Sequence, residues 1–176
     1  LNLTMLIEGL YNSATNTTVQ DTVRVYARDS VNPYNIIDSA KGVINTNGQV
    51  SVFLTQGQNS QPYYLQVKHR NSLETWSKTT QTFTGGVMNY DFTTASTKAF
   101  GDNMKQVDSS PVEFAVYSGD VNKDGTVDAT DLAAIDNDAQ NFVSGYVVTD
   151  LSGDSFIDGT DYSLADNNAT NFVSVI

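Results

Sequence analysis

What the sequence lacks excludes several kinds of site. The chain contains no cysteine, so disulfides, thiolate zinc sites and cysteine nucleophiles are excluded. Its only histidine is His69, which argues against zinc, since zinc prefers His or Cys ligands. No segment approaches the roughly 20 apolar residues that a membrane-spanning helix needs. We therefore expect a folded, soluble protein that does not insert into a membrane.

Basic residues are almost absent from the last third of the chain. Residues 119–176 contain eleven Asp, no Glu and a single basic residue, Lys123, which gives a net charge of about −10, whereas residues 1–118 carry about −1. Such an acidic region repels nucleic acid and anionic membranes, and it attracts cations. The same segment holds regularly spaced Phe, Val, Leu and Ile, which disordered acidic tails lack. The sequence therefore predicts a folded, cation-binding region and no nucleic-acid partner.

Residues 1–118 show the pattern of short β-strands separated by turns. In DTVRVYARD, Val23, Val25 and Ala27 alternate with more polar residues and share one face. Asn47-Gly48 lies between two β-prone runs in VINTNGQVSVFL, which predicts a hairpin. The other strand candidates are LTMLIEGLY, YYLQVKH, TQTF, VMNYDF and VEFAVY. About seven or eight strands at roughly ten-residue spacing favour an antiparallel β-sandwich, so the expected fold class is mostly β with a small α part.

One stretch within this region carries a family resemblance. The segment NTNGQVSVFLTQGQNSQPYYLQVKHRN (residues 45–71) resembles the prealbumin-like sandwich modules common in secreted bacterial proteins. In those modules a turn, a strand, a short Gly-containing loop and a Y-x-L-x-V strand follow one another. The resemblance implies a scaffold or accessory module and transfers no catalytic residue.

The last third contains an internal repeat with a period of 30 residues. Four aspartates at 120, 124, 128 and 131 recur at 150, 154, 158 and 161, and NFVS at 141–144 recurs at 171–174. Each unit consists of an apolar lead-in, an acidic loop and a stretch with helical periodicity. At 3.6 residues per turn, the apolar face of the first helix comprises Leu132, Ile135, Ala139, Phe142 and Val143, and that of the second comprises Leu164, Ala165, Ala169, Phe172 and Val173. One such helix cannot bury its apolar face alone, so we expect the two to pack together as a domain over residues 119–176.

Both acidic segments have the ligand spacing of an EF-hand calcium loop. Such loops use oxygen atoms at positions 1, 3, 5, 7, 9 and 12, with the backbone carbonyl at position 7. In the first loop these positions are Asp120, Asn122, Asp124, Thr126, Asp128 and Asp131. In the second loop they are Asp150, Ser152, Asp154, Phe156, Asp158 and Asp161. These twelve residues are the predicted metal ligands, and Val127 and Ile157 at position 8 are expected to anchor the loops in the core.

Carboxylates gathered in one loop need a cation. At separations of roughly 5 Å and an effective dielectric constant near 20, each repulsive pair costs on the order of 3 kcal/mol. The about six pairs of one loop together exceed the stability of a typical domain, roughly 5–15 kcal/mol. All-oxygen ligation suits Ca²⁺, whereas Mg²⁺ prefers a smaller octahedron and keeps its waters. We therefore predict two structural Ca²⁺ ions.

The two loops also depart from the usual pattern. Position 12 is Asp in both, where the usual EF-hand has a bidentate Glu. Position 6 is Gly125 in the first loop but Ser155 in the second, and a non-glycine residue there is expected to have a strained positive φ. On this ground we expect the second site to bind calcium more weakly than the first.

The doubled loop resembles the dockerin type I family, over residues 119–176. VEFAVYSGD and GYVVTD have an extended pattern, as do the lead-in segments of that family, and Asp at position 12 is also usual there. The resemblance implies structural Ca²⁺ and docking to a cohesin module on a scaffold protein. The positions that match the docking surface are Ala129-Thr130 with Asp136-Asn137, and Gly159-Thr160 with Asp166-Asn167. The whole chain looks like the end modules of large secreted bacterial proteins, which implies an extracellular or cell-surface location.

Three functions stay open at this point. The leading hypothesis is a non-catalytic, secreted, calcium-stabilised attachment module that binds a protein partner, consistent with a chain that begins at Leu1 rather than Met. The second is a subunit that self-assembles through strand edges into a calcium-dependent filament or surface layer. The third and least favoured is a carbohydrate-binding module that uses Trp76, Tyr63 and Tyr64.

Two further groups of residues have ambiguous roles. Lys68, His69 and Arg70 form a basic run that we interpret as an exposed strand end, because no nucleophile or acid is positioned beside His69 by the sequence. An enzyme is therefore not expected. Asp136 and Asp166 each border the apolar face of a predicted helix, where an Asp is a surface group, an additional ligand or an interface contact.

Overall fold

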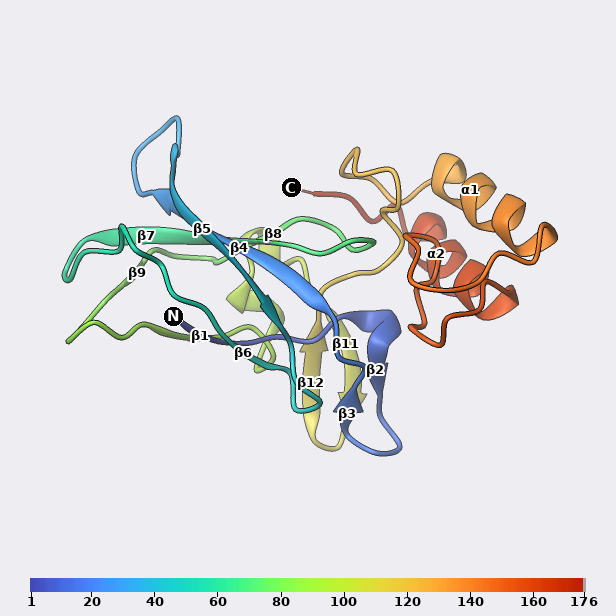
Figure 1. The fold of residues 1–176 in the computed structure, drawn as a ribbon, viewed down its shortest axis with the longest axis horizontal. Coiled ribbons are helices and arrows are strands. Elements are labelled where there is room, and N and C mark those ends of the chain that lie inside the picture. Colours follow the sequence, from blue (N-terminus) through green and yellow to red (C-terminus); the bar gives the residue numbers. More distant parts are fainter. Residues whose placement is uncertain (176) are drawn as a thin grey trace.

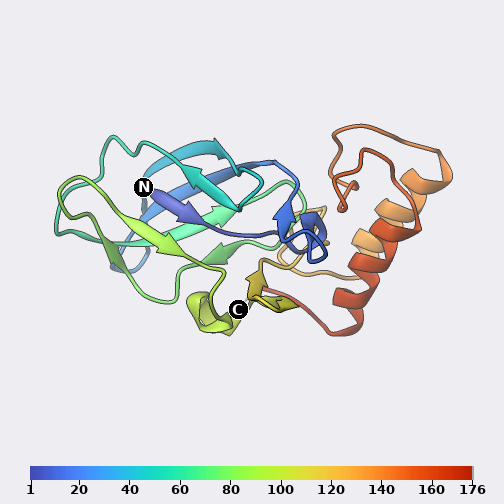
Figure 2. The ribbon, with the colours of Figure 1, turned by 90° about the horizontal axis from the view of Figure 1, so that it is seen from below.

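The structure is a computed structural model that describes residues 1–175. The strands lie in the chain up to residue 115, and two helices follow at one end of the molecule (Figures 1 and 2). We call residues 1–118 the β-rich region and residues 119–175 the repeat pair. No helix among residues 1–175 has the length and hydrophobicity to cross a bilayer. The predicted fold class, mostly β with a small α part, is confirmed.

Twelve strands, most of them short, build the β-rich region. They are β1 Asn2–Thr4, β2 Tyr11–Asn12, β3 Thr17–Thr18, β4 Thr22–Asp29, β5 Ile36–Val43, β6 Gln49–Ser51, β7 Pro62–Lys68, β8 Thr75–Trp76, β9 Gln81–Thr82, β10 Asn89–Asp91, β11 Lys105–Ser109 and β12 Val112–Ala115. Three 3₁₀ helices, η1 Glu8–Leu10, η2 Ser96–Lys98 and η3 Phe100–Asp102, connect some of them.

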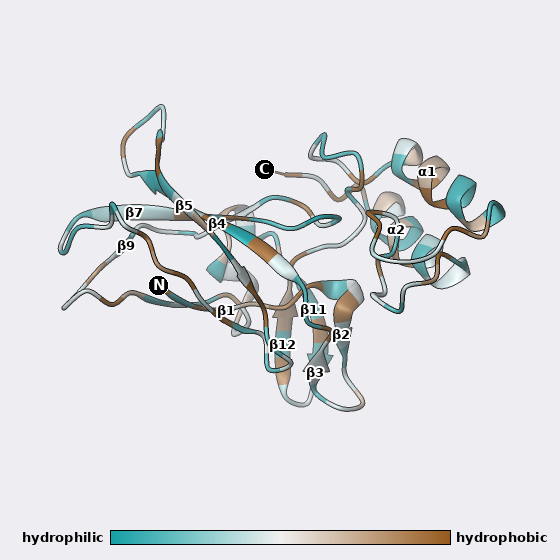
Figure 3. Ribbon diagram, viewed as in Figure 1, coloured by the Kyte–Doolittle hydropathy of each residue, from teal (hydrophilic) through white to brown (hydrophobic). Residues whose placement is uncertain are grey.

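Two sheets enclose the main core. One has five strands in the order β5-β4-β7-β8, with β9 also paired to β7, and the other has the order β10-β1-β6. Along β4, Val23, Val25 and Ala27 are fully buried as predicted, and hydrophobic and hydrophilic residues alternate along this strand (Figure 3). Strand β1 pairs with β10 in parallel, so the expectation of a wholly antiparallel sandwich is wrong in this sheet.

Two other predictions for the β-rich region need correction. Asn47-Gly48 does form a turn, in which the Gly48 N–H donates to the Asn45 carbonyl (2.9 Å). The flanking strands do not form a hairpin, because β5 pairs with β4 and β6 pairs with β1. The candidate strand LTMLIEGLY is interrupted by η1, since the chain turns there toward the repeat pair.

The repeat pair consists of α1 Ala129–Gln140 and α2 Gly159–Thr170, which lie side by side in both views (Figures 1 and 2). Their core contains Ile135 and Ala165, both fully buried, and Val127 at 1% exposure. Leu73 of the β-rich region is part of the same core cluster. The repeat pair therefore does not close its core with its own residues alone.

The predicted apolar faces of the helices are wrong at their last turn. Phe142 and Phe172 are 90% and 87% exposed, because each helix ends before them and Asn141 and Asn171 form the C-caps. Both phenylalanines have positive φ, 53° and 54°, a left-handed conformation that is rare for bulky residues. The helical period no longer applies once the chain has left the helix.

Candidate metal centre

The two loops are related by an approximate twofold arrangement. Each loop bonds to the segment that follows the other helix. The Val127 N–H donates to the Val173 carbonyl (2.9 Å), and the Ile157 N–H donates to the Val143 carbonyl (3.4 Å). Val127 and Ile157 are buried, as predicted for position 8, so each loop is fixed both by its anchor side chain and by a backbone contact to the other repeat.

The aspartates at position 9 of the loops cap the helices. Asp128 is the N-cap of α1 and Asp158 is the N-cap of α2, and each forms a capping box with the aspartate three residues later. Such boxes satisfy N–H groups that the first helical turn leaves without partners. This capping role was not predicted from the sequence, although the pattern Asp-x-x-Asp before a helical segment indicates a capping box.

The aspartates at position 12 are completely buried. Asp131 Oδ1 accepts hydrogen bonds from the backbone N–H groups of Val121 (2.8 Å) and Asn122 (3.2 Å), and its Oδ2 accepts one from Asp128 (3.0 Å). Asp161 makes the equivalent three bonds in the second loop. Each of these carboxylates therefore connects the start of its loop to the start of its helix.

Buried oxygen atoms without partners test whether a metal fits. Asp120, at position 1, is 2% exposed, and its Oδ1 has no hydrogen-bond partner. In the second loop Ser152 Oγ, at position 3, is buried without a partner. Burial raises the pKa of Asp120 and of Asp150, the two position-1 carboxyls. Oxygen donors that are buried and unsatisfied fit a hard cation such as Ca²⁺, which would supply the missing interaction.

The side chains of each loop do not converge on one point. Among residues 1–175, no three His, Asp or Glu side chains are arranged so that they could hold a metal ion. The reason lies in local bonding, because Asp128 and Asp131 accept backbone N–H groups and Asn122 Nδ2 donates to Asp124 Oδ2 (2.9 Å). The twelve predicted ligands lie in two loops as expected, and their ligation of calcium stays a prediction that requires these side chains to turn inward.

Backbone strain is shared equally between the loops. Ser155 has a φ of 70°, as predicted, but Lys123 in the first loop has a φ of 66°. The other left-handed positions are Gly125 and Gly153. Each loop therefore contains one glycine and one non-glycine residue in this conformation. The strain argument for a weaker second site consequently does not hold.

The segments before the loops differ from each other. The first follows β12, which ends at Ala115, so it is extended as predicted. Residues 145–150 instead form bends and a turn, in which the Val147 N–H donates to the Gly145 carbonyl (2.9 Å). The prediction of an extended GYVVTD lead-in is therefore wrong.

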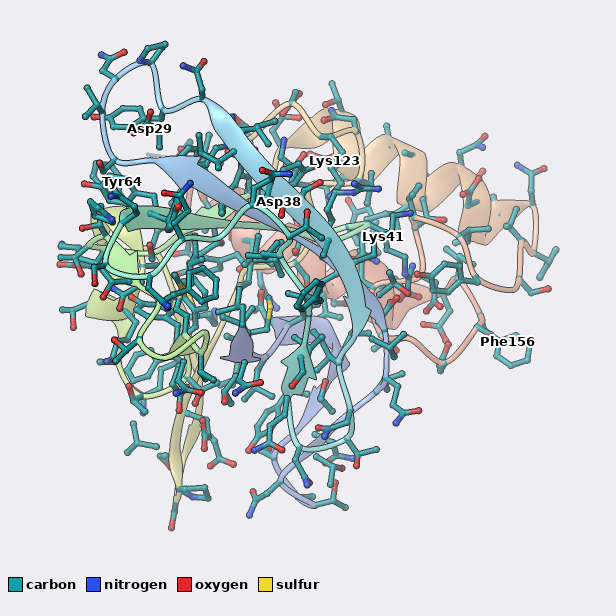
Figure 4. The ribbon with its side chains drawn as sticks, turned by 60° about the vertical axis from the view of Figure 1, so that its left-hand side comes forward. Asp29, Asp38, Lys41, Tyr64, Lys123 and Phe156 are labelled. Carbon is teal, nitrogen blue, oxygen red and sulfur yellow. The ribbon has the colours of Figure 1, made fainter. Side chains whose placement is uncertain are left out.

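The helix positions that match a docking surface are mostly open to solvent. Ala129, Thr130, Asp136 and Asn137 of α1 are all exposed. Their counterparts in α2 are exposed too, except Asp166, which is half-buried. Asp136 accepts a hydrogen bond from Gln140 (2.6 Å), which is the behaviour of a helix-surface residue. Phe156 of the second loop also points away from the body of the molecule (Figure 4).

His69 is not at an exposed strand end. Its side chain is fully buried, and Nε2 lies 3.0 Å from Asp21 Oδ2. Burial lowers the pKa of His69. Burial by itself would raise the pKa of Asp21, but the nearby His69 ring and the hydrogen bonds from Tyr146 and Arg70 hold it well below its ordinary value. The repeat pair covers this end of β7, a long-range contact that strand patterns do not reveal.

The predicted aromatic platform is divided between surface and core. Tyr64 and Trp76 lie near each other with ring centroids 6.3 Å apart, and Tyr34 joins them edge-on. A surface cavity of about 190 Å³ lies over these rings and Phe100. Tyr63 is instead buried against Phe83 in the core. Tyr64 points toward the surface (Figure 4), so only part of the proposed sugar platform is available.

A comparison with known families agrees with the repeat geometry. Residues 118–168 match the family model of the dockerin type I domain. None of the curated proteins matches the chain. The matched region is therefore dockerin-like, a calcium-binding and non-catalytic type of domain that takes part in protein–protein interaction.

Proposed function

We propose that this chain is a secreted attachment module with no catalytic activity of its own, in which the repeat pair binds two Ca²⁺ ions and one protein partner. The observation that carries the proposal is the doubled loop–helix unit, whose two loops have the same spacing and the same capping boxes. The match to the dockerin type I family supports it. The β-rich region, residues 1–118, serves as a prealbumin-like spacer domain, and residues 119–176 form the second domain.

The proposed ligands are the twelve residues at positions 1, 3, 5, 7, 9 and 12 of the two loops. Thr126 and Phe156 contribute their backbone carbonyls, and the others contribute side-chain oxygens. The unsatisfied oxygens of Asp120 and Ser152 support this assignment. Extracellular calcium is abundant enough for a site of modest affinity, which agrees with a location outside a bacterial cell.

The proposed partner surface extends from the first turn to the middle of each helix. Thr130 and Asp136 on α1, and Thr160 and Asp166 on α2, occupy equivalent places. Their oxygen and carboxylate groups suit a cohesin-like partner that offers basic and hydrogen-bonding side chains. Calcium acts indirectly on this surface, since it fixes the loops from which the helices start.

A calcium titration tests the metal part of the proposal. Native mass spectrometry and calorimetry of the full chain are expected to give two bound ions. Asp124→Ala and Asp154→Ala are each expected to remove one ion, because Asp at position 5 is a direct ligand. Asp136→Ala, on an exposed helix position, is the matched control and is expected to leave both ions bound. A chain that binds no calcium would refute the proposal.

Capture of a partner tests the attachment part. The immobilised chain is incubated with purified cohesin modules, with calcium and then with a chelator. We expect calcium-dependent retention that decreases when Thr130 and Thr160 are both replaced by Arg, and that persists when Thr17 of the β-rich region is replaced by Arg. Retention that ignores both calcium and the helix variants would place the partner surface elsewhere.

The edge strand β5 favours one alternative, self-assembly. β5 pairs only with β4, and it exposes Ile36 (52%), Ile37 (37%) and Val43 (58%). An eight-residue edge strand with exposed apolar residues at both ends is a template for pairing with another chain, although Asp38 and Lys41 in its middle oppose such pairing. Sedimentation at high protein concentration with calcium distinguishes the two functions, because assembly predicts large species and the attachment module predicts a monomer.

A further inference from the structure

The end of β7 lies against both calcium loops. The residues after this strand, 69–72, contact the starts of the two loops, and Lys123 reaches this segment from the first loop. Nothing in the repeat itself predicts such a contact, since segment 69–72 belongs to the other region of the chain.

Asn71 touches the start of both loops at once. Its side chain is fully buried, and Nδ2 donates to the backbone carbonyl of Asp150 (2.7 Å), the first ligand position of the second loop. Its own carbonyl accepts from the N–H of Gly119 (2.8 Å), the residue directly before the first ligand position, Asp120. One residue of the β-rich region thus holds the backbone at the start of each loop.

Arg70 and Ser72, on either side of Asn71, also connect the β-rich region to the two loops. Arg70 lies between Asp21 and the second loop, with Nε 2.9 Å from Asp21 Oδ2 and a terminal nitrogen 3.5 Å from Asp150 Oδ2. Arg70 also donates to the Val147 carbonyl. On the other side, Lys123 Nζ donates to the carbonyls of Ser72 (3.0 Å) and Asp120 (2.9 Å).

We propose that Asn71 is a positioning residue for calcium binding, through which the β-rich region holds the backbone at the start of each loop. The inference rests on the proposed function. A loop whose first ligand residue is already fixed loses less conformational entropy when the ion binds, so it binds the ion more tightly. Residues that orient metal ligands from outside commonly change metal affinity by roughly 10- to 100-fold.

The two loops are held to different degrees. The second loop depends on the Asn71 side chain, whereas the first depends on the Asn71 backbone carbonyl, which a substitution leaves in place. We therefore expect a substitution at Asn71 to weaken the second site more than the first. Because coupling is reciprocal, calcium in the second loop also stabilises the β-rich region around Asn71.

The test uses Asn71→Leu in the full chain, which keeps the branched shape of the side chain, although with a larger volume, and removes the donor. Calcium affinity is measured by calorimetry, and the amide NMR signals of Val127 and Ile157 report the two loops separately. We expect the second loop to lose roughly tenfold in affinity, and the first to change by less than about threefold because its contact with the backbone of residue 71 is retained.

Asn103→Leu is the matched control. Asn103 Nδ2 also donates from the β-rich region to a backbone carbonyl of the repeat pair, that of Ser174 (2.8 Å), but it lies outside both loops. This variant is expected to leave both calcium affinities unchanged. An equal loss of affinity in Asn103→Leu and Asn71→Leu would overturn the inference, because calcium affinity would then depend on any hydrogen bond between the two regions and not on Asn71 in particular.

A second variant decides the matter if Asn71→Leu does not fold. Arg70→Lys keeps the positive charge near Asp150, so the Coulomb term is retained, but it removes the planar fork that spans Asp21 and the loop. We expect roughly threefold weaker calcium binding in the second loop, less than the roughly 10- to 100-fold typical of residues that orient metal ligands, because the charge is kept. Unchanged affinity in this variant, or in a folded Asn71→Leu, overturns the inference. A wild-type chain that binds no calcium overturns the proposed function instead.

Discussion

The β-rich region and the repeat pair are stabilised in different ways. The β-rich region buries a continuous apolar cluster that includes Leu65, Met88 and Phe92, and its net charge is near zero. The repeat pair has a much smaller apolar cluster, to which Leu73 of the other region contributes, and a charge of about −10. Apolar burial therefore stabilises the first region, whereas the proposed function makes the second depend on a cation and on its neighbour as well.

In the repeat pair, buried carboxylates connect backbone segments that an apolar core would otherwise hold together. Asp131 and Asp161 are fully buried and hold three backbone N–H groups each. In the proposed function the same groups carry the repulsive charge that calcium offsets, so folding and ion binding are expected to be linked in this region.

The largest effect is expected for Asp131→Ala. The variant leaves three backbone N–H groups, one buried and two partly buried, without an acceptor. A buried group without a partner costs roughly 1–3 kcal/mol and a partly buried one costs less, so the repeat pair should lose about 3–5 kcal/mol of unfolding free energy. Chemical denaturation followed by far-UV circular dichroism in saturating calcium measures this loss. Asp136→Ala, which removes an exposed carboxylate, is the control and should change stability by less than about 0.5 kcal/mol. Similar losses in both variants would show that the hydrogen bonds of Asp131 do not contribute measurably to the unfolding free energy.

A smaller effect is expected for Leu73→Ala. Leu73 is 1% exposed and packs in the core of the repeat pair, although it belongs to the β-rich region. Its truncation should cost about 2–4 kcal/mol and should lower hydrogen-exchange protection in α1 and α2. Leu54→Ala, in the main core, is the matched control and should lower protection in the sheets instead. Loss of protection in the sheets alone for Leu73→Ala would mean that the two cores are separate.

The pH dependence of stability should reveal the buried His69. Burial lowers its pKa in the folded chain, so below the ordinary histidine pKa of about 6.5 the unfolded chain binds a proton that the folded chain does not. Stability should therefore fall as the pH decreases through this value and should be unaffected above it. Asp21 favours the protonated ring, while Arg70 and Lys123 oppose it.

One NMR titration measures this directly, since His69 is the only histidine. Its ring signals should titrate below pH 6.5, and His69→Gln should reduce the slope of stability against pH in that range. A ring that titrates at the ordinary value would contradict the buried, neutral state and would restore the interpretation of an exposed strand end. A ring that titrates above that value would mean that Asp21 holds it protonated.

The smallest effect, with an informative sign, is expected for Phe142→Gly and Phe172→Gly. Both side chains are exposed and both backbones have positive φ, so glycine relieves strain of roughly 1–2 kcal/mol against an entropic cost of about 0.5–1 kcal/mol. Each variant should be as stable as the parent chain or slightly more stable in thermal melts. A loss of about 3–5 kcal/mol would mean that the rings are buried, as the helical period alone predicts.

Local patterns in the sequence were sufficient to predict several elements of the fold. The alternation in β4 predicted its buried face, and the period of 30 residues predicted two loops followed by two helices. Local patterns did not predict where the helices end, because the C-caps at Asn141 and Asn171 interrupt the apolar period before the phenylalanines. They also did not predict which strands pair, as the turn at Asn47-Gly48 shows.

The contacts between the regions were outside the reach of sequence patterns. His69 and Asn71 lie in a polar run after β7, and only the folded chain places them against the loops. The loops themselves were predictable because an EF-hand spacing is a property of twelve consecutive residues. The capping boxes were not predicted because the same aspartates are also the predicted ligands.

The central claim is that calcium gives the repeat pair its fixed shape, while the β-rich region holds its own fold. An amide NMR spectrum of the full chain, recorded with calcium and then with excess chelator, tests it most directly. Signals of residues 119–175 are expected to collapse toward random-coil positions in the chelator, while most signals of residues 1–118 stay dispersed. Helical signals that remain dispersed and protected without any divalent ion would show that calcium does not fix the shape of the repeat pair.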